Sequence, residues 1–98
     1  MTDRHTMLHF PMEHRMADAA RGDGDAAYDL GICYQTGTAG VAIDLIEAHK
    51  WFNLAAVSGM AAAQDARAEV ASAMSARQIA TAQAAARAWL GSLHQRAA

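Results

Sequence analysis

The stretch AAYDLGICYQTGTAGVAIDLIEAHKWFNLAAVSG, residues 26–59, predicts two helices joined by a glycine-containing turn. The first helix is expected to begin near Asp23 or Asp25, with Asp25 as its N-cap, because Gly22 and Gly24 interrupt what precedes it. It ends at the turn of residues 37–40, where two glycines favour backbone with positive φ. One face of this helix is apolar at the spacing i, i+3, i+4, i+7: Ala27, Leu30, Gly31 and Tyr34.

The second helix of the pair is marked at both ends. Asp44 is a good N-cap, and Glu47 stands three residues later, as in a capping box. Ser58 and Gly59 end the helix, with Gly59 as the expected C′ residue. The apolar face of this helix consists of Ala48, Trp51, Phe52, Ala55 and Ala56. The two helices are therefore expected to form a hairpin.

The composition predicts a small all-α domain with a thin core. Of the 98 residues 53% are hydrophobic, but 26 residues are alanine. Alanine favours helix over strand and contributes little area on burial. Tyr34 and Trp51 are therefore expected to supply most of the large buried area, and Gly31 is expected to let the facing helix approach closely.

Two further helices and an arm are expected outside this hairpin. Helices are predicted over about 61–73 and from a Ser-x2-Gln capping box at residues 75–78 to about residue 94. The apolar stripe of the last helix consists of Ile79, Ala82, Ala86, Trp89, Leu90 and Leu93. Residues 1–16 show no clean period and are expected to form a loose N-terminal arm, in which a helical turn can follow Pro11. Residues 16–20 can form the stub of a preceding helix.

The first hairpin closely resembles the Sel-1-like repeat family, which is related to the tetratricopeptide repeats. The matching segments are Leu-Gly-x2-Tyr at 30–34, a glycine turn followed by valine at 37–41, and Ala-x2-Trp-x3-Ala-Ala-x2-Gly at 48–59. The turn is one residue longer, at Ala39, than the commonest form of the family. The motif positions are Ala27, Leu30, Gly31, Tyr34, Gly37, Gly40, Asp44, Ala48, Trp51, Ala55, Ala56 and Gly59.

This resemblance implies a short α-solenoid within a single domain of residues 17–98. One Sel-1-like hairpin spans about 24–60, and a C-terminal capping hairpin spans about 61–94. The implied function is that of a bacterial adaptor or scaffold, which acts by protein–protein interaction without catalysis or a cofactor. Related solenoids bind partners on the concave surface lined by their first helices. The candidate partner contacts are therefore Tyr28, Asp29, Ile32 and Gln35.

Several classes of protein are disfavoured by the sequence. It has no nucleophile elbow, Walker motif or paired-carboxylate motif, so no enzyme activity is expected. No apolar run reaches membrane-spanning length, and the first twenty residues lack the apolar stretch of a signal peptide. The single cysteine, Cys33, excludes an internal disulfide and suits a reducing compartment, so a cytoplasmic location is expected. A net charge of −2 gives no basic footprint for nucleic acid.

Two alternative functions remain open at this point. His5, His9 and His14 have spacings at which imidazoles can bind Zn²⁺ or Ni²⁺, which allows a small metal- or ligand-binding protein, although no metal site is predicted. The other alternative is a subunit completed by assembly with another chain or a second copy, because a short solenoid buries little core.

The distribution of charge also allows two interpretations. Residues 17–48 carry six acids and one base, whereas residues 74–98 carry three arginines and no acid. This asymmetry either complements the helix dipoles or favours head-to-tail association. We favour association through an open face around Tyr28 and Ile32; the alternative is that the arm folds back on this face.

Overall fold

The computed structural model describes residues 11–97, with side chains for residues 12–93. This part of the chain contains five helices and no strand. They are α2 (Pro11–Ala20), α3 (Gly24–Thr36), α4 (Leu45–Val57), α5 (Ala61–Ala71) and α6 (Ala76–Ala97). The predicted all-α fold is confirmed, and the four predicted helices correspond to α3–α6.

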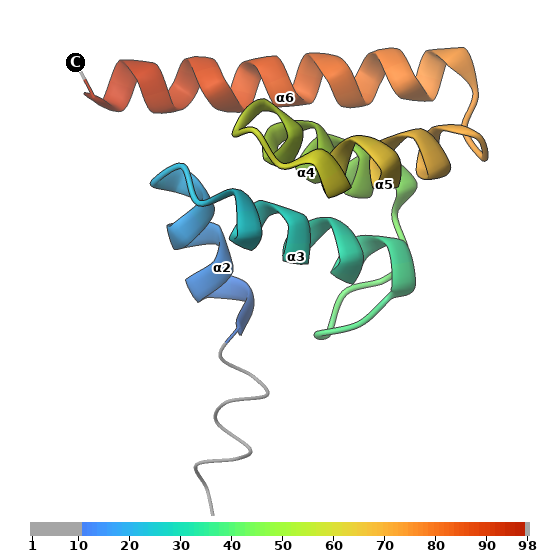
Figure 1. Ribbon diagram of the computed structural model, residues 1–98, viewed down its shortest axis with the longest axis horizontal. Coiled ribbons are helices and arrows are strands. Elements are labelled where there is room, and N and C mark those ends of the chain that lie inside the picture. The colour runs from blue at the N-terminus through green and yellow to red at the C-terminus, as the bar shows by residue number, and fades with distance from the viewer. Residues whose placement is uncertain (1–10, 98) are drawn as a thin grey trace, which may run out of the picture.

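Helix α4 occupies the centre of the fold. Helices α3, α5 and α6 all pack against it, and α2 packs against α3 (Figure 1). In Figure 1, α6 runs along one side of the α4–α5 layer, and α3 separates this layer from α2. The buried residues of α4 are Ala48, His49, Trp51, Phe52, Leu54 and Ala55. Helix α4 contributes buried residues to both core clusters, Trp51, Leu54 and Ala55 to one and Ala48 and Phe52 to the other.

The glycine turn between α3 and α4 has the predicted positive-φ backbone. Gly37 and Gly40 have φ of 72° and 83°, and the additional residue, Ala39, is also left-handed at φ 57°. The N–H of Asp44 donates to the Tyr34 carbonyl at 2.8 Å, which closes the loop. The Asp44 carboxylate then accepts the N–H of Glu47 at 3.1 Å, so Asp44 is the N-cap of α4, as predicted.

Two other predicted helix ends are also confirmed. At the end of α4, Gly59 has φ 103° and donates to Ala56, while Met60 donates to Ala55, which is the Schellman pattern. Before α6, the Ser75 N–H donates to Gln78 Oε1 at 2.8 Å and the Gln78 N–H donates to Ser75 Oγ at 3.1 Å. This exchange is a complete capping box.

The start of α3 differs from the prediction. The N-cap is Asp23, not Asp25: the Asp23 carboxylate accepts the N–H groups of Asp25 at 2.9 Å and Ala26 at 3.2 Å. Gly22, with φ 91°, ends the preceding turn, so Gly24 already belongs to the first turn of α3. Asp25 lies within that turn, where its charge suits the helix dipole.

The N-terminal arm is more helical than predicted. Helix α2 begins at Pro11, so the predicted boundary between arm and domain at residues 16 and 17 lies inside a helix. Met12, Met16 and Ala19 follow helical spacing and pack with the main core cluster. The prediction of a loose arm is therefore wrong for residues 11–16, because these apolar side chains find burial against α3. Residues 1–10 lie outside the described part.

The largest fully buried side chains are Trp51, Phe52 and Leu30. Trp51 is buried as predicted. Tyr34, which was also predicted to supply large buried area, is only half-buried, and Phe52 is fully buried instead. Burial, together with the negative charges of Glu47 and Asp44, raises the pKa of Tyr34. Phe52, which has no hydroxyl group that needs a hydrogen-bond partner, is therefore the ring beside Trp51 that is fully buried.

Gly31 allows the close approach of α3 and α4, as predicted. A Cβ at this position would lie 2.5 Å from both Cδ1 and Cε1 of Phe52, inside van der Waals contact. Because the Phe52 ring is fully buried, it has no free direction in which to move. The face of α3 at this point must therefore lack a side chain.

We predict that Gly31→Ala destabilises the protein although alanine favours helix. Overpacking against Phe52 is expected to cost about 1–3 kcal/mol, more than the roughly 0.5–1 kcal/mol gained in helix propensity. Gly91→Ala is the matched control, because a Cβ at Gly91 meets nothing within 4 Å. Urea unfolding measures both variants. A Gly31→Ala variant at least as stable as Gly91→Ala would contradict the packing described.

His49 is the only polar or charged residue that is buried in the described part of the chain. It is 3% exposed, and its Nδ1 has no hydrogen-bond partner among the described residues. Burial and the nearby Arg67 guanidinium lower the pKa of His49 below 6.5, so the fold favours the neutral imidazole. Arg67 is held in place by a hydrogen bond to the Asn53 side chain.

We predict that His49 makes stability depend on pH. Because the folded-state pKa of His49 lies below 6.5, the neutral imidazole contributes its full stability above pH 6.5. This stability is lost as the pH falls toward and through the folded-state pKa. One proton changes the free energy of unfolding by up to about 1.4 kcal/mol per pH unit. Urea unfolding at pH 7.5 and 5.0 should show a smaller loss for His49→Gln than for the wild type. Equal losses would refute this role.

Candidate protein-interaction surfaces

A groove lies between α3 and α5, the first helices of the two hairpins. It has a volume of about 380 Å³ and is lined by Tyr28 of α3 and by Ala62, Asp65, Ala66 and Glu69 of α5. The α5 residues recur at spacings of three and four, so they form one stripe along the helix. Along α5 the small side chains of Ala62 and Ala66 alternate with the carboxylates of Asp65 and Glu69, and Tyr28 forms the opposite wall. We call this site the α3–α5 groove.

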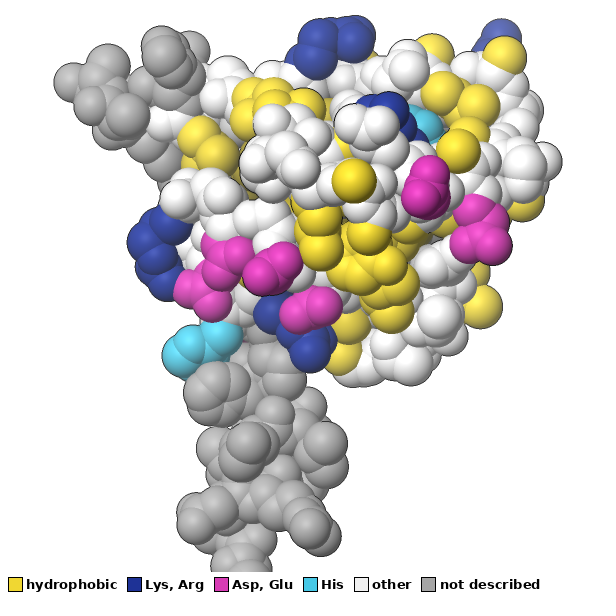
Figure 2. Space-filling model, in the orientation of Figure 1, with side chains coloured by type: hydrophobic (Ala, Val, Ile, Leu, Met, Phe, Trp, Pro, Cys, Tyr) yellow, Lys and Arg dark blue, Asp and Glu magenta, His cyan; other side chains and the backbone are white. Residues whose placement is uncertain are grey.

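Among the side chains that the structure describes, none forms an ion pair with the carboxylates of the groove. Asp65 and Glu69 are exposed and take part in none of the ion pairs within the described residues. On the face drawn in Figure 2, hydrophobic side chains gather near the middle, and acidic side chains lie on either side of them, those on the left next to basic side chains. This arrangement suits a partner that offers both apolar surface and positive charge.

The four predicted contact residues share helix α3 but have different surroundings. The Tyr28 ring lies 5.4 Å from the Phe52 ring, and Tyr28 and Ile32 pack against the core cluster of Ala48, Phe52 and Val70. Tyr28, Ile32 and Gln35 are half-buried, and Asp29 is exposed. The face around Tyr28 and Ile32 is therefore less open than expected, because the protein's own core uses part of both side chains. Of the four, Tyr28 alone lines the groove.

Helix α2 approaches α3 on the side of Cys33 and Asp29. Arg15 of α2 donates a hydrogen bond to Cys33 Sγ at 3.1 Å, and its Nε lies 4.0 Å from Asp29 Oδ2. Cys33 is 4% exposed. Residues 11–20 therefore contact α3 on the side of Cys33 and Asp29, and whether the arm covers the face around Tyr28 and Ile32 stays a prediction.

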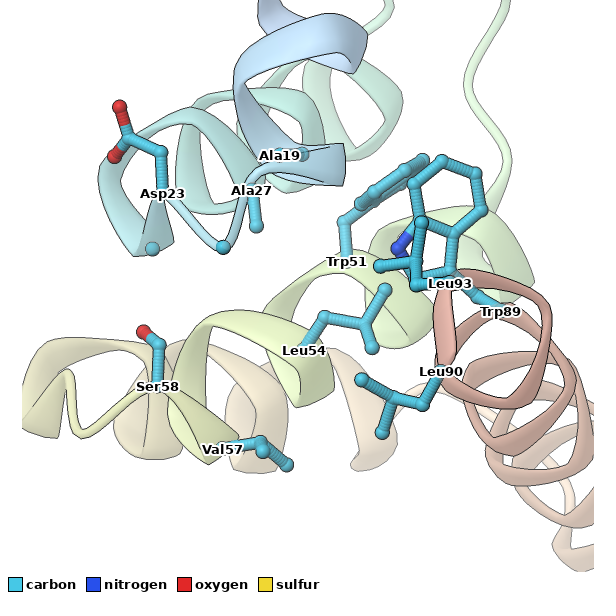
Figure 3. Close-up of a pocket in the computed structure, with 12 residues that line it drawn as sticks. Ala19, Asp23, Ala27, Trp51, Leu54, Val57, Ser58, Trp89, Leu90 and Leu93 are labelled. Atoms are coloured by element: carbon cyan, nitrogen blue, oxygen red, sulfur yellow. The ribbon is translucent and has the colours of Figure 1, made fainter. Parts of the chain in front are cut away.

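A second hollow, the apolar pocket, lies on another side of α4. Its volume is about 240 Å³. Figure 3 shows it between the α2–α3 turn and the helices α4 and α6, with the Asp23 carboxylate pointing away from it. Most of its lining is apolar: Ala19, Ala27, Trp51, Leu54, Val57, Trp89, Leu90 and Leu93, together with Gly22, Asp23, Gly24 and Ser58.

An aromatic and charged cluster fixes α6 to α4 beside this pocket. The Trp51 and Trp89 rings meet edge to face at a centroid distance of 5.0 Å. Lys50 Nζ lies 4.4 Å from the centre of the Trp51 ring and 3.0 Å from Glu47 Oε1. Trp51 Nε1 donates to the same carboxylate at 3.2 Å. Glu47 therefore serves the tryptophan and the lysine, and it does not complete the capping box with Asp44.

The histidine hypothesis falls largely outside the described residues. His5 and His9 lie in residues 1–10, and His14 lies on α2. Within residues 11–97, no group of three or more His, Cys, Asp or Glu side chains is placed to hold a metal ion.

None of the helices described here has the length and apolarity needed to cross a membrane.

Comparisons of the chain with protein-family models, with curated proteins and with solved structures gave no match.

The α5 side of the groove was not among the predicted contacts. Its signal is present in the sequence, because Asp65 and Glu69 follow Ala62 and Ala66 by three residues each. That spacing places two acids and two small residues on one helical stripe. Only the packing of α5 beside Tyr28 turns the stripe into part of a groove.

We predict that α2 protects the Cys33 thiol. Its reaction with Ellman's reagent should be at least roughly tenfold slower in the native protein than in urea, because the side chain is buried. Arg15→Ala should accelerate the native reaction, since Arg15 covers the sulfur. Arg21→Ala is the control. This substitution removes the same charge elsewhere on the segment, where Arg21 pairs with Asp18. Equal rates in the two variants would show that Arg15 does not shield the thiol.

Proposed function

We propose that the protein is a non-catalytic protein-interaction module of the Sel-1-like repeat type, which binds a positively charged partner segment in the α3–α5 groove. The observation that carries this proposal is the groove itself. Tyr28 faces a stripe on α5 that alternates small side chains with Asp65 and Glu69. The proposed role is that of an adaptor or scaffold.

The sequence pattern of the first hairpin supports this proposal. Gly31 stands where α3 and α4 approach closely, Asp44 caps α4, and Trp51 is buried between α4 and α6. These are the physical roles expected of glycine, aspartate and tryptophan at those positions. Binding on the surface of the first helices is then the expected mode for a helical repeat module.

The charge of the groove favours a basic partner segment over an acidic one. Asp65 and Glu69 line the groove, lie one helical turn apart on α5 and are exposed. Neither helix lines the groove with a base. Lysine or arginine side chains reach such carboxylates while their aliphatic stems cover the alanines. An acidic segment would meet like charges along the whole stripe.

We predict that a fluorescein-labelled peptide of alternating lysine and leucine binds the protein, and that the corresponding glutamate–leucine peptide does not. Asp65→Lys combined with Glu69→Lys should weaken binding roughly tenfold, because two reversed charges change the interaction by on the order of 1–2 kcal/mol. Fluorescence anisotropy measures the affinity, and added salt should lower it.

The control for this experiment is Glu13→Lys, which changes an exposed acid on α2 outside the groove. It should bind the lysine–leucine peptide nearly as tightly as the wild type does. If the double variant of α5 and the Glu13 variant lose affinity equally, binding reflects net charge and the groove is not the site. Turnover of a substrate that one substitution abolishes would contradict the non-catalytic role.

A further inference from the structure

The apolar pocket between the α2–α3 turn, α4 and α6 is separate from the proposed groove. Its lining shares no residue with the groove. The apolar stripe of α6 explains why it stays open. Ala82 and Ala86 are fully buried, but further along the same stripe Trp89 and Leu93 are half-buried and Leu90 is 41% exposed. The stripe therefore continues beyond the part of α6 that is covered.

Helix lengths account for this uncovered end. Helix α6 has 22 residues, whereas α4 and α5 have 13 and 11. At 1.5 Å per residue, α6 is longer than either neighbour by more than 10 Å. Val57, at the last residue of α4, adds a side chain that is 63% exposed beside the pocket. Two large aliphatic side chains, Val57 and Leu90, are thus presented together to the solvent.

The size of the pocket favours protein side chains over a larger ligand. Its volume of about 240 Å³ lies below the roughly 300–1,000 Å³ typical of small-molecule sites. It has room for one or two aliphatic side chains. Its own rim carries two such side chains, Val57 and Leu90. A surface with a hollow and matching apolar protrusions can be complementary to itself.

The charges around the pocket point to a second copy of the chain. On one side, the start of α3 carries exposed Asp23 and Asp25, and α3 contains no base. On the other side, α6 contains no acid, and exposed Arg87 lies three residues before Leu90 on the same flank. A two-fold axis through the pocket brings the acidic side of one copy to the basic side of the other.

We propose that the apolar pocket is the interface of a two-fold symmetric homodimer, in which Leu90 and Val57 of each copy enter the pocket of the other. Each pocket then loses its exposed apolar surface, and the acids at the start of α3 meet Arg87 of the second copy. This dimer leaves both α3–α5 grooves open, so it does not depend on the function proposed for them.

Sedimentation velocity at about 100 μM tests the proposal. The wild type should sediment with twice the mass of the chain, and Leu90→Glu should raise the dimer dissociation constant at least tenfold. Because Leu90 is partly exposed, this variant should keep its helical circular dichroism. Ala84→Glu adds the same charge to an exposed position of α6 outside the pocket and should remain dimeric. Arg87→Glu should weaken the dimer, and more so at low salt.

Three results would overturn the proposal. The first is a wild-type monomer at this concentration, including a monomer whose pocket binds an apolar dye, which would assign the pocket to a small molecule. The second is a dimer that Leu90→Glu leaves unchanged, which would place the interface elsewhere. The third is an equal loss of the dimer in Ala84→Glu, which would show that added charge on α6 acts without regard to the pocket.

Discussion

The contact of Gly31 with the Phe52 ring sets the distance between α3 and α4, and the remaining helices depend on it. Phe52 is fully buried only because α3 has no side chain at this point. With α3 seated closely, α4 presents Trp51 to α6 and Ala48 to the cluster around Val70 of α5. In a chain with so few large apolar residues, a gap at this contact would leave no other side chains to fill it.

Much of the fold follows from local signals in the sequence. The caps at Asp44 and Gly59 and the capping box at Ser75 and Gln78 act within one helical turn, so they depend little on the rest of the structure. The close approach at Gly31 could also be predicted, because a glycine on an apolar helical face has few other roles. These features are sufficient to place α3–α6 in order.

The missed features depend on contacts between distant parts of the chain. The sequence of α2 carries only a weak helical pattern, and the helix is stabilised by packing on α3. The same packing places Arg15 against Cys33, 18 positions away. Leu90 belongs to the apolar stripe of α6, but this stripe extends beyond the end of the helix that covers it, so Leu90 is partly exposed. For the same reason, the four predicted contact residues include Tyr28 of the groove but not the α5 residues that face it.

Binding of a basic segment in the α3–α5 groove can be followed residue by residue. The most direct measurement is a two-dimensional NMR titration of the ¹⁵N-labelled protein with the lysine–leucine peptide. Amide shifts should change along Tyr28, Ala62 and Ala66, while amides around Leu90 and Val57 stay in place. Shift changes confined to the apolar pocket, or spread evenly over the acidic surface, would contradict binding in the groove.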